Sequence, residues 1–323
     1  MILKINRFLE KAMPFFIPSS VVIGVLISDY IVDFSYLIPW IFAFMTFTGS
    51  LNSNFASFKN AVLHPFPIFI VLIVLHIVMP LMALGIGHVV FTGDIYTITG
   101  MVLMMSIPTG ITSFVWISIN KGNNTLALTI ILIGALLSPF IVPLTMSLLV
   151  GGNVQIDSLS MMVGLFWMIV IPSIIGMTLN QVTKGKVVNI LSARLSPISK
   201  IGMGIVVMLN GAVVAPYLLD VKLKVVGIAL TVLAIAFLGY VISFLIAIWC
   251  KQPKETVIAL TFTGGMRNIS AGVVLASTYF PASVAIPVVL GMLFQQILAS
   301  IFGVLLNKYY RKLELDESIV RES

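Results

Sequence analysis

The chain has 323 residues, of which 59% are hydrophobic and 9% are charged, and its formal net charge is +7. A soluble domain usually carries about 25% charged residues, so the composition excludes a globular protein wetted on all sides and predicts a polytopic membrane protein. The single cysteine, Cys250, excludes a disulfide framework. Orientation in a membrane explains the excess of positive charge better than nucleic-acid binding, which we do not expect.

The apolar stretches predict ten transmembrane helices, because a span needs about 20 apolar residues. In chain order the spans are placed at 12–31, 36–51, 67–91, 95–119, 123–149, 158–180, 198–219, 224–250, 254–278 and 282–307. Basic residues before the first apolar run resemble the start of a signal peptide. No small-residue cleavage site follows that run, so we expect a retained first helix.

The distribution of basic residues predicts the orientation of these spans. With the N-terminus inside, 15 Lys and Arg residues fall in inside segments, among them Lys4, Arg7, Lys11 and Lys59, and only Lys222 and Lys224 fall outside. The aspartates of the loops lie outside, at Asp29, Asp33, Asp94, Asp157 and Asp220. Because Lys and Arg bias sets orientation, we expect a multi-pass protein of the cell membrane with both termini in the cytoplasm.

An internal repeat is a further expectation from the spacing of the spans. A shift of 155 residues places each of the first five spans on one of the last five. Five is an odd number, so the second half has to be inverted relative to the first, as in many secondary transporters. We therefore predict one five-helix repeat over 1–153, an inverted one over 154–310 and a cytoplasmic tail over 311–323; chance similarity between apolar helices is the alternative.

The fourth and ninth predicted spans each contain residues that interrupt a helix. Pro108 removes a backbone donor, and glycines favour non-helical backbone in both segments. Interruptions at membrane depth leave polar backbone groups that lipid cannot satisfy, and a matching pair of them is a strong pointer to a transport site. The candidate substrate-binding residues from these two segments are Thr109, Gly110, Ile111, Thr112, Ser113, Arg267 and Asn268.

Arg267 lies in the middle of the ninth predicted span, where its side chain cannot reach a headgroup layer. Placing an arginine there costs at least about 2.5–3.5 kcal/mol, yet no Asp or Glu falls in the middle of any predicted span. Its partners must be backbone carbonyls, neutral polar side chains or a bound anion. Two roles stay open for Arg267: a structural brace for the unwound segment, and a part in substrate binding or coupling.

Four other polar residues fall in the middle of predicted spans. His76 is a candidate coupling residue because it is the other titratable group at this depth, although a hydrogen-bonded packing role is equally open. Gln295, Gln296 and Asn210 are candidate substrate-binding residues, with helix–helix hydrogen bonding as the alternative. At least one of the adjacent glutamines should face the site.

These segments resemble the bile acid:sodium symporter family over nearly the whole chain. The resemblance implies a panel domain of spans 1, 2, 6 and 7 and a core domain of spans 3–5 and 8–10, in which the broken helices 4 and 9 cross. It also implies organic anions such as bile acids, pantoate and 2-oxo acids as substrates. The segments that carry it are Pro108-Thr109-Gly110-Ile111-Thr112-Ser113, Lys121-Gly122-Asn123, Leu137-Ser138-Pro139 and Gly265-Met266-Arg267-Asn268.

The sequence departs from this family at residues that the resemblance assigns to sodium. The family typically has Glu at the position of Thr263 and Gln at that of Arg267. Other departures from its polar pattern are His76, Phe114, Ala127 and Ile131. We therefore expect no cofactor and disfavour sodium; if sodium is bound, the remaining ligands are Ser113, Thr263 and Asn268.

The function expected from the sequence is transport of small organic anions by alternating access, independent of sodium, in a monomer embedded in the lipid bilayer. Arg267 would replace bound sodium, and Arg267, His76 and Thr263 are the candidate coupling residues. One alternative is a sodium-coupled symporter of the same family, and another is a non-transporting membrane sensor for an anion. An enzyme is not expected, because we find no catalytic triad, cysteine nucleophile, metal-ligand cluster or phosphate loop.

Overall fold

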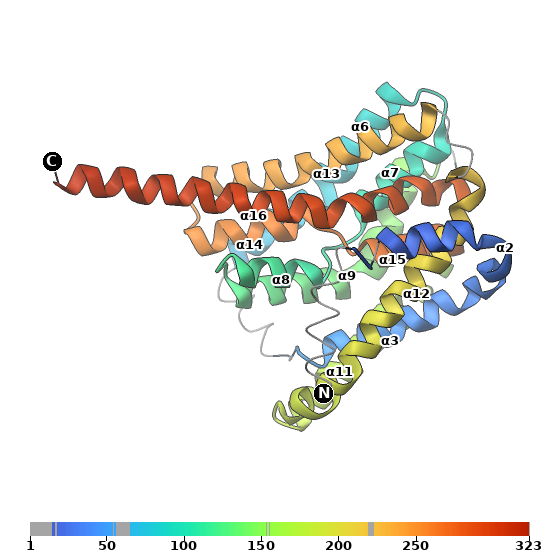
Figure 1. The fold of residues 1–323 in the computed structure, drawn as a ribbon, viewed down its shortest axis with the longest axis horizontal. Helices are drawn as coiled ribbons and strands as arrows, with labels where there is room; N and C mark the ends of the chain where they lie inside the picture. Colours follow the sequence, from blue (N-terminus) through green and yellow to red (C-terminus); the bar gives the residue numbers. More distant parts are fainter. Residues whose placement is uncertain are drawn as a thin grey trace.

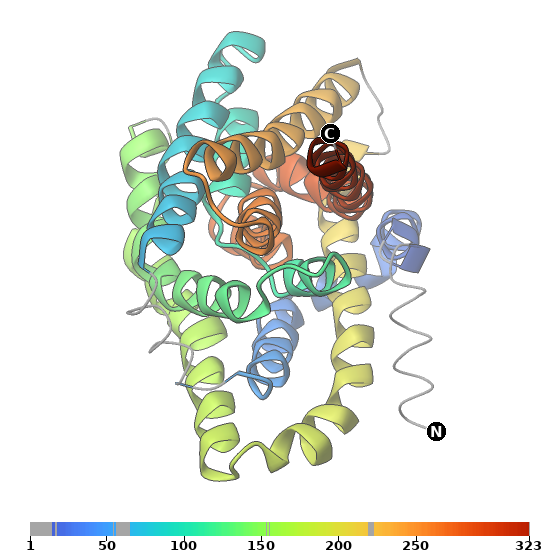
Figure 2. The same cartoon turned by 90° about the vertical axis from the view of Figure 1, so that its left-hand side faces the viewer.

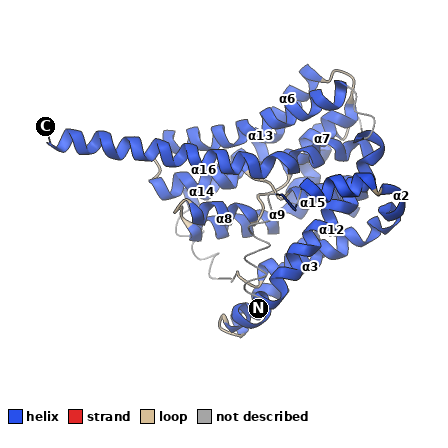
Figure 3. Cartoon of the chain, in the orientation of Figure 1, coloured by secondary structure: helices blue, strands red, loops and turns tan. Residues whose placement is uncertain are grey.

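The computed structural model describes residues 15–16, 18–53, 55, 65–152, 154, 156–218 and 223–322. Within these ranges the chain is helical, with short connections and no strand (Figure 3). Six residues used to predict the orientation lie outside the described residues: Lys4, Arg7, Lys11, Lys59, Asp220 and Lys222.

The first half of the chain contains one interrupted pair of helices, α7 and α8 (Figure 1). Its elements are α2 (Ser28–Ile31), η1 (Val32–Leu37), α3 (Ile38–Ser50), α5 (Pro65–Ile73), η2 (Val74–Val78), α6 (Met79–Val90), α7 (Ile95–Ser106), α8 (Thr112–Ile119) and α9 (Asn124–Val150). Of these, η2 is a single π-helical turn inserted between α5 and α6.

The second half also contains one interrupted pair, α14 and α15. Its elements are α10 (Ser158–Leu165), η3 (Phe166–Val170), α11 (Ile171–Val182), η4 (Val188–Ser192), α12 (Ala193–Leu218), α13 (Leu223–Trp249), α14 (Lys254–Gly265), α15 (Ile269–Tyr279), η5 (Ala282–Val284) and α16 (Ala285–Glu322). The C-terminal end of α16 projects beyond the other helices (Figure 1).

Eight stretches of the described chain are helical, long and apolar enough to cross a membrane. This confirms an all-α, multi-pass membrane protein, whereas the count of ten spans stays a prediction. The first predicted span begins outside the described residues, and the fourth is divided into α7 and α8, of which α7 is apolar but short. The inverted repeat likewise stays a prediction.

The helices pack in two groups; in Figure 2 the blue α3 and the yellow-green α11 lie in the lower part of the view. In the first group, α3 packs against α11 and α12, and α12 also packs against α2. In the second, α13 packs against α14 and α16, α6 against α7, and α8 against α9 and α14. The groups meet where α12 packs against α15 and α16, and where α10 packs against α9. This packing supports the panel and core division, which remains a prediction.

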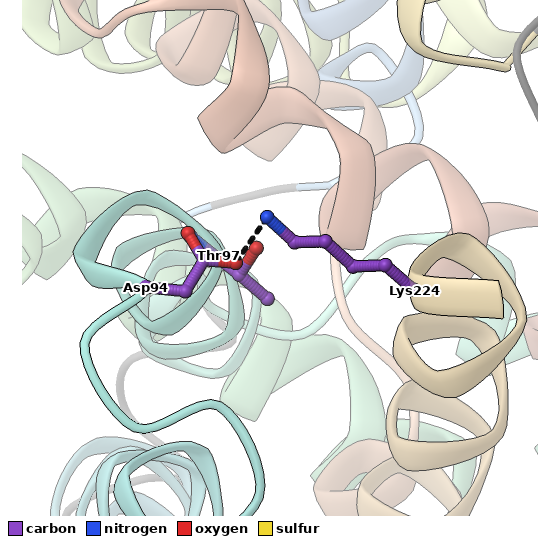
Figure 4. A network of polar contacts seen from close by, with 3 residues as sticks. All are labelled: Asp94, Thr97 and Lys224. Atoms are coloured by element: carbon purple, nitrogen blue, oxygen red, sulfur yellow. Dashed lines mark hydrogen bonds and ion pairs between the residues drawn. The ribbon is translucent and has the colours of Figure 1, made fainter. Parts of the chain in front are cut away.

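An ion pair joins two helices of the second group near their N-termini (Figure 4). Lys224 Nζ lies 2.8 Å from Asp94 Oδ2, and Asp94 Oδ1 accepts a hydrogen bond from the Thr97 backbone at 3.4 Å as the N-cap of α7. Burial alone would raise the pKa of Asp94, but the hydrogen bonds from Lys224 and Thr97 outweigh it and lower this pKa below its ordinary value.

We expect Asp94→Asn to remove the ion pair while keeping the helix cap, since asparagine caps as well as aspartate. The pKa of Asp94 is lower in the folded protein than in the unfolded chain. The ion pair therefore stabilises the folded protein at pH values above the ordinary pKa of aspartate, and this stabilisation is lost as the pH falls through the lowered pKa of the folded state. Lys224 is largely exposed, so the loss near pH 7 should be at most about 1 kcal/mol. Thermal unfolding in detergent at pH 7 and pH 3 checks this; an equal loss at both values would contradict it.

Candidate transport site

Two interrupted helices form the centre of the second group, as the sequence predicts. α7 ends at Ser106, and the chain continues in extended conformation at Ile107 before α8 begins at Thr112. α14 ends at Gly265, and Met266 is extended before α15 begins at Ile269. The first interruption follows from Pro108, which has no N–H for a helical hydrogen bond and clashes with the preceding turn.

The two interruptions touch through their backbones. The Asn268 N–H donates to the Pro108 carbonyl at 2.8 Å, so a group freed in one helix is satisfied by the other. A Cβ atom added to Gly110 would lie 3.0 Å from the Arg267 carbonyl oxygen and 3.2 Å from Asn268 Cα. The crossing is therefore a close backbone contact at which a side chain larger than that of glycine at position 110 would press on the other interruption.

Helix α16 supports both interrupted helices by side-chain hydrogen bonds. Gln295 Oε1 accepts from the Arg267 backbone N–H at 2.9 Å, and Gln296 Oε1 accepts from Trp116 Nε1 at 3.1 Å. Further along, Asn307 Nδ2 donates to Asn120 Oδ1 at 2.8 Å. The two glutamines are among the residues predicted from the sequence, whereas Trp116, Asn120 and Asn307 are not.

Arg267 is buried at the crossing, with 2% of its surface exposed. Nη1 donates to the Gly264 carbonyl at 2.7 Å and makes a longer contact of 3.4 Å with the Met266 carbonyl. Gly264 lies in the last turn of α14, where the helix dipole favours a cation. Nε and Nη2 have no hydrogen-bond partner among the described residues. The side chain thus braces the unwound segment while part of its donor capacity is left over.

Three residues are the candidate sodium ligands that the sequence retains, and the side-chain oxygen of each forms a hydrogen bond within its own segment. Ser113 Oγ donates to the Gly110 carbonyl at 2.8 Å, and Thr263 Oγ1 donates to the Ala259 carbonyl at 2.8 Å. Asn268 Oδ1 accepts from the Ala271 N–H as the N-cap of α15. No group of three or more His, Cys, Asp or Glu side chains suited to a metal occurs in the described ranges. The hydroxyls of Ser113 and Thr263 donate their protons and keep oxygen lone pairs, so the expected absence of sodium beside the Arg267 guanidinium stays a prediction.

The N-terminus of α8 presents the open side of the crossing. Ile111 is 46% exposed and Thr112 is half-buried, whereas Thr109 and Ser113 are buried behind them. No side chain caps this helix. The Ser113 and Phe114 N–H groups donate to the Gly110 and Ile111 carbonyls at 3.0 and 3.1 Å, so what this N-terminus offers an anion is mainly the partial positive charge of the helix end.

Two further candidates differ in their relation to the crossing. His76 is in the π-helical turn η2, where its ring lies beside the Ser106 backbone at the end of α7 and interacts electrostatically with Arg267. Asn210 is buried on α12, and its amide has no partner within the described part of the chain. The predicted roles of both residues remain predictions.

The fold and this crossing define a class of protein: a membrane transporter, and not an enzyme. A family model for the SBF-like CPA transporter family, which is of the bile acid:sodium symporter type, matches residues 15–311. The chain belongs to this family, as its resemblance to the bile acid:sodium symporters predicts.

Three relatives are found in the comparison with curated proteins. Uncharacterized protein YbaS of Bacillus subtilis is 51% identical over 93% of this chain and 98% of its own length. An uncharacterized sodium-dependent transporter, YocS, of the same organism is 24% identical over 87% of this chain and 88% of its own. The probable sodium/metabolite cotransporter BASS1 of Oryza sativa is 28% identical over 79% of this chain and 61% of its own.

We expect Gly110→Ala to destabilise the crossing, because the added methyl group would press on the backbone of Arg267 and Asn268. Overpacking of this kind costs about 1–3 kcal/mol. Gly85→Ala on α6 is the matched control, since its Cβ would meet nothing within 4 Å. Thermal unfolding of both purified variants in detergent measures the difference, and equal midpoints would show that the backbones do not cross this closely.

Proposed function

We propose that this protein is a secondary transporter of small organic anions that works by alternating access without sodium. In this proposal the guanidinium of Arg267 supplies the positive charge that bound sodium supplies elsewhere in the family. The observation that carries the proposal is the position of Arg267: it is buried at the crossing and bonded to the Gly264 carbonyl at 2.7 Å.

Charge balance supports this substitution. Two sodium ions beside one glutamate give a site of net charge +1, and one arginine without a glutamate gives the same. Thr263 stands where the family pattern has glutamate, and its hydroxyl is already bonded to the Ala259 carbonyl. A cation placed beside Arg267 would be repelled in this low-dielectric environment.

The substrate class follows from the open side of the crossing. The uncapped N-terminus of α8 favours an anionic group, and the buried charge of Arg267 behind it adds long-range attraction. The neighbouring exposed side chains, Ile111 and Val115, are apolar, which suits the carbon chain of a carboxylate. We therefore propose small carboxylates, of the pantoate, 2-oxo acid or bile acid type, as substrates.

Alternating access is supported by the packing of the two helix groups. The helices α3 and α12 pack against α15, whereas α8 packs within its own group, against α9, α14 and α16. A rocking movement of one group on the other would uncover the crossing on alternate sides, as in other transporters with broken helices.

A sodium-coupled symporter is the second candidate function. Its support comes from the names of two relatives, a sodium-dependent transporter and a probable sodium/metabolite cotransporter. Ser113, Thr263 and Asn268 keep oxygen lone pairs beside their present hydrogen bonds, so repulsion by Arg267 is the main argument against a cation here. The two candidates differ in one observable, the response of transport to sodium.

We expect purified protein in liposomes to exchange labelled carboxylates equally well with sodium and with choline as the cation, because Arg267 already provides the charge. The measurement is counterflow of 2-oxo acids, pantoate and a bile acid. Arg267→Ala should abolish exchange, while Arg194→Ala, which removes an exposed cation at the start of α12, should not. Exchange that requires sodium in the wild type would overturn the proposal in favour of the symporter, and full activity of Arg267→Ala would remove Arg267 from the mechanism.

A further inference from the structure

Three turns at helix ends contain a lysine in the left-handed backbone conformation. Lys121 follows α8, Lys184 follows α11 and Lys251 follows α13, with φ angles of 58°, 50° and 53°. Glycine is the usual residue at this position of a helix end, because a side chain there is strained. The turn between α6 and α7, which the sequence places on the other side of the membrane, has Gly93 at a φ of 82°.

The hydrogen bonds of these turns do not require lysine. In each turn a backbone N–H donates to the carbonyl five residues earlier, which satisfies a group that the helix end leaves free. The bonds run from Gly122 to Ile117 at 2.8 Å, from Gly185 to Asn180 at 2.8 Å and from Gln252 to Ala247 at 3.1 Å. The three lysine side chains are exposed, and none forms an ion pair or a hydrogen bond within the described part of the chain. Charge is thus the property that lysine adds at these positions.

Two of these turns meet the end of α16 and form with it a basic corner of the molecule. The Asn123 N–H donates to the Glu255 carbonyl at 2.9 Å, which joins the turn after α8 to the turn after α13. Lys254 Nζ lies 5.2 Å from the centre of the Tyr310 ring, which joins the second turn to α16 where this helix leaves the others (Figure 1). The Glu255 carboxylate is exposed here, but cations outnumber it. The exposed cations of the basic corner are Lys121, Lys251, Lys254, Lys308, Arg311 and Lys312.

Aromatic side chains place the basic corner at the level of lipid head groups. Trp249 is the last residue of the apolar helix α13, two residues before Lys251, and it is 83% exposed. Tyr309 on α16 packs against Phe244 of α13 and is 38% exposed. Tryptophan and tyrosine are enriched where membrane helices leave the hydrocarbon. A lysine just beyond such a tryptophan can reach the phosphate layer with its long side chain.

We propose that the basic corner binds the head groups of anionic phospholipids, with Lys121 and Lys251 held outward by their left-handed turns. Lys184 presents a further cation in the same way at the end of α11. The sequence places all three turns on the cytoplasmic side, where the membrane surface is negatively charged. The occupant is a lipid and not a soluble phosphate, because exposed Trp249 beside the cations suits a ligand that also has acyl chains. Lipid binding here does not depend on the proposed transport function.

Thermal unfolding in a neutral detergent with added lipid tests the proposal. Phosphatidylglycerol should raise the wild-type midpoint in a saturable manner, whereas phosphatidylcholine and soluble glycerol 3-phosphate should not. In a triple variant with Lys121→Gly, Lys184→Gly and Lys251→Gly, the apparent affinity for phosphatidylglycerol should fall, by up to about fivefold for each lysine. Without lipid, the triple variant should unfold at the temperature of the wild type or above it, because glycine relieves the strain of the left-handed conformation.

Two single variants separate lipid binding from other effects of charge. Lys251→Arg keeps the cation and should respond to phosphatidylglycerol as the wild type does. Lys224→Gln removes a cation that is 59% exposed at the other end of α13, and it should leave the lipid affinity unchanged.

The proposal is overturned if phosphatidylcholine or glycerol 3-phosphate acts as phosphatidylglycerol does, or if Lys224→Gln weakens the lipid response as much as Lys251→Gly. It is also overturned if the triple variant keeps the full lipid response. In that case a lower midpoint without lipid would assign the lysines to the stabilisation of helix C-termini. None of these outcomes depends on which organic anion is transported.

Discussion

Backbone groups at membrane depth need hydrogen-bond partners within the protein, because hydrocarbon offers none. This constraint governs the centre of the molecule, where two helices are interrupted. The Pro108 carbonyl accepts the Asn268 N–H at 2.8 Å, and the Arg267 N–H is taken by Gln295 at 2.9 Å. Each interruption is thus repaired by another element. The polar backbone is satisfied in this way, and the α8 N-terminus is left without a side-chain cap.

Arg267 combines structural and electrostatic roles at this crossing. Its Nη1 hydrogen bond to Gly264 closes the end of α14, and the same group carries a fixed charge near the α8 N-terminus. Helix α16 holds the partners in place from one side through Gln295 and Gln296. Under the proposed function Arg267 also sets the charge of the transport site, and substitution there should then alter both stability and transport.

Much of this centre could be predicted from the sequence. Pro108 and the glycines located both interruptions. The depth of Arg267, with no carboxylate in the middle of any predicted span, limited its partners to backbone carbonyls, neutral polar side chains or a bound anion. The particular partner could not be predicted, because the Gly264 carbonyl becomes available only once α14 ends. The hydrogen bonds of Trp116 and Asn120 could not be predicted either. They depend on how α8 is rotated toward α16, and the weak apolar periodicity of these helices does not specify that rotation.

An experimental density map that resolves side chains at the crossing tests the central claim most directly. The account predicts the Arg267 guanidinium on the Gly264 carbonyl, the Asn268 N–H on the Pro108 carbonyl, and no cation between the two interruptions. A guanidinium that points into lipid, or a metal ion coordinated beside it by Ser113, Thr263 and Asn268, would contradict the account.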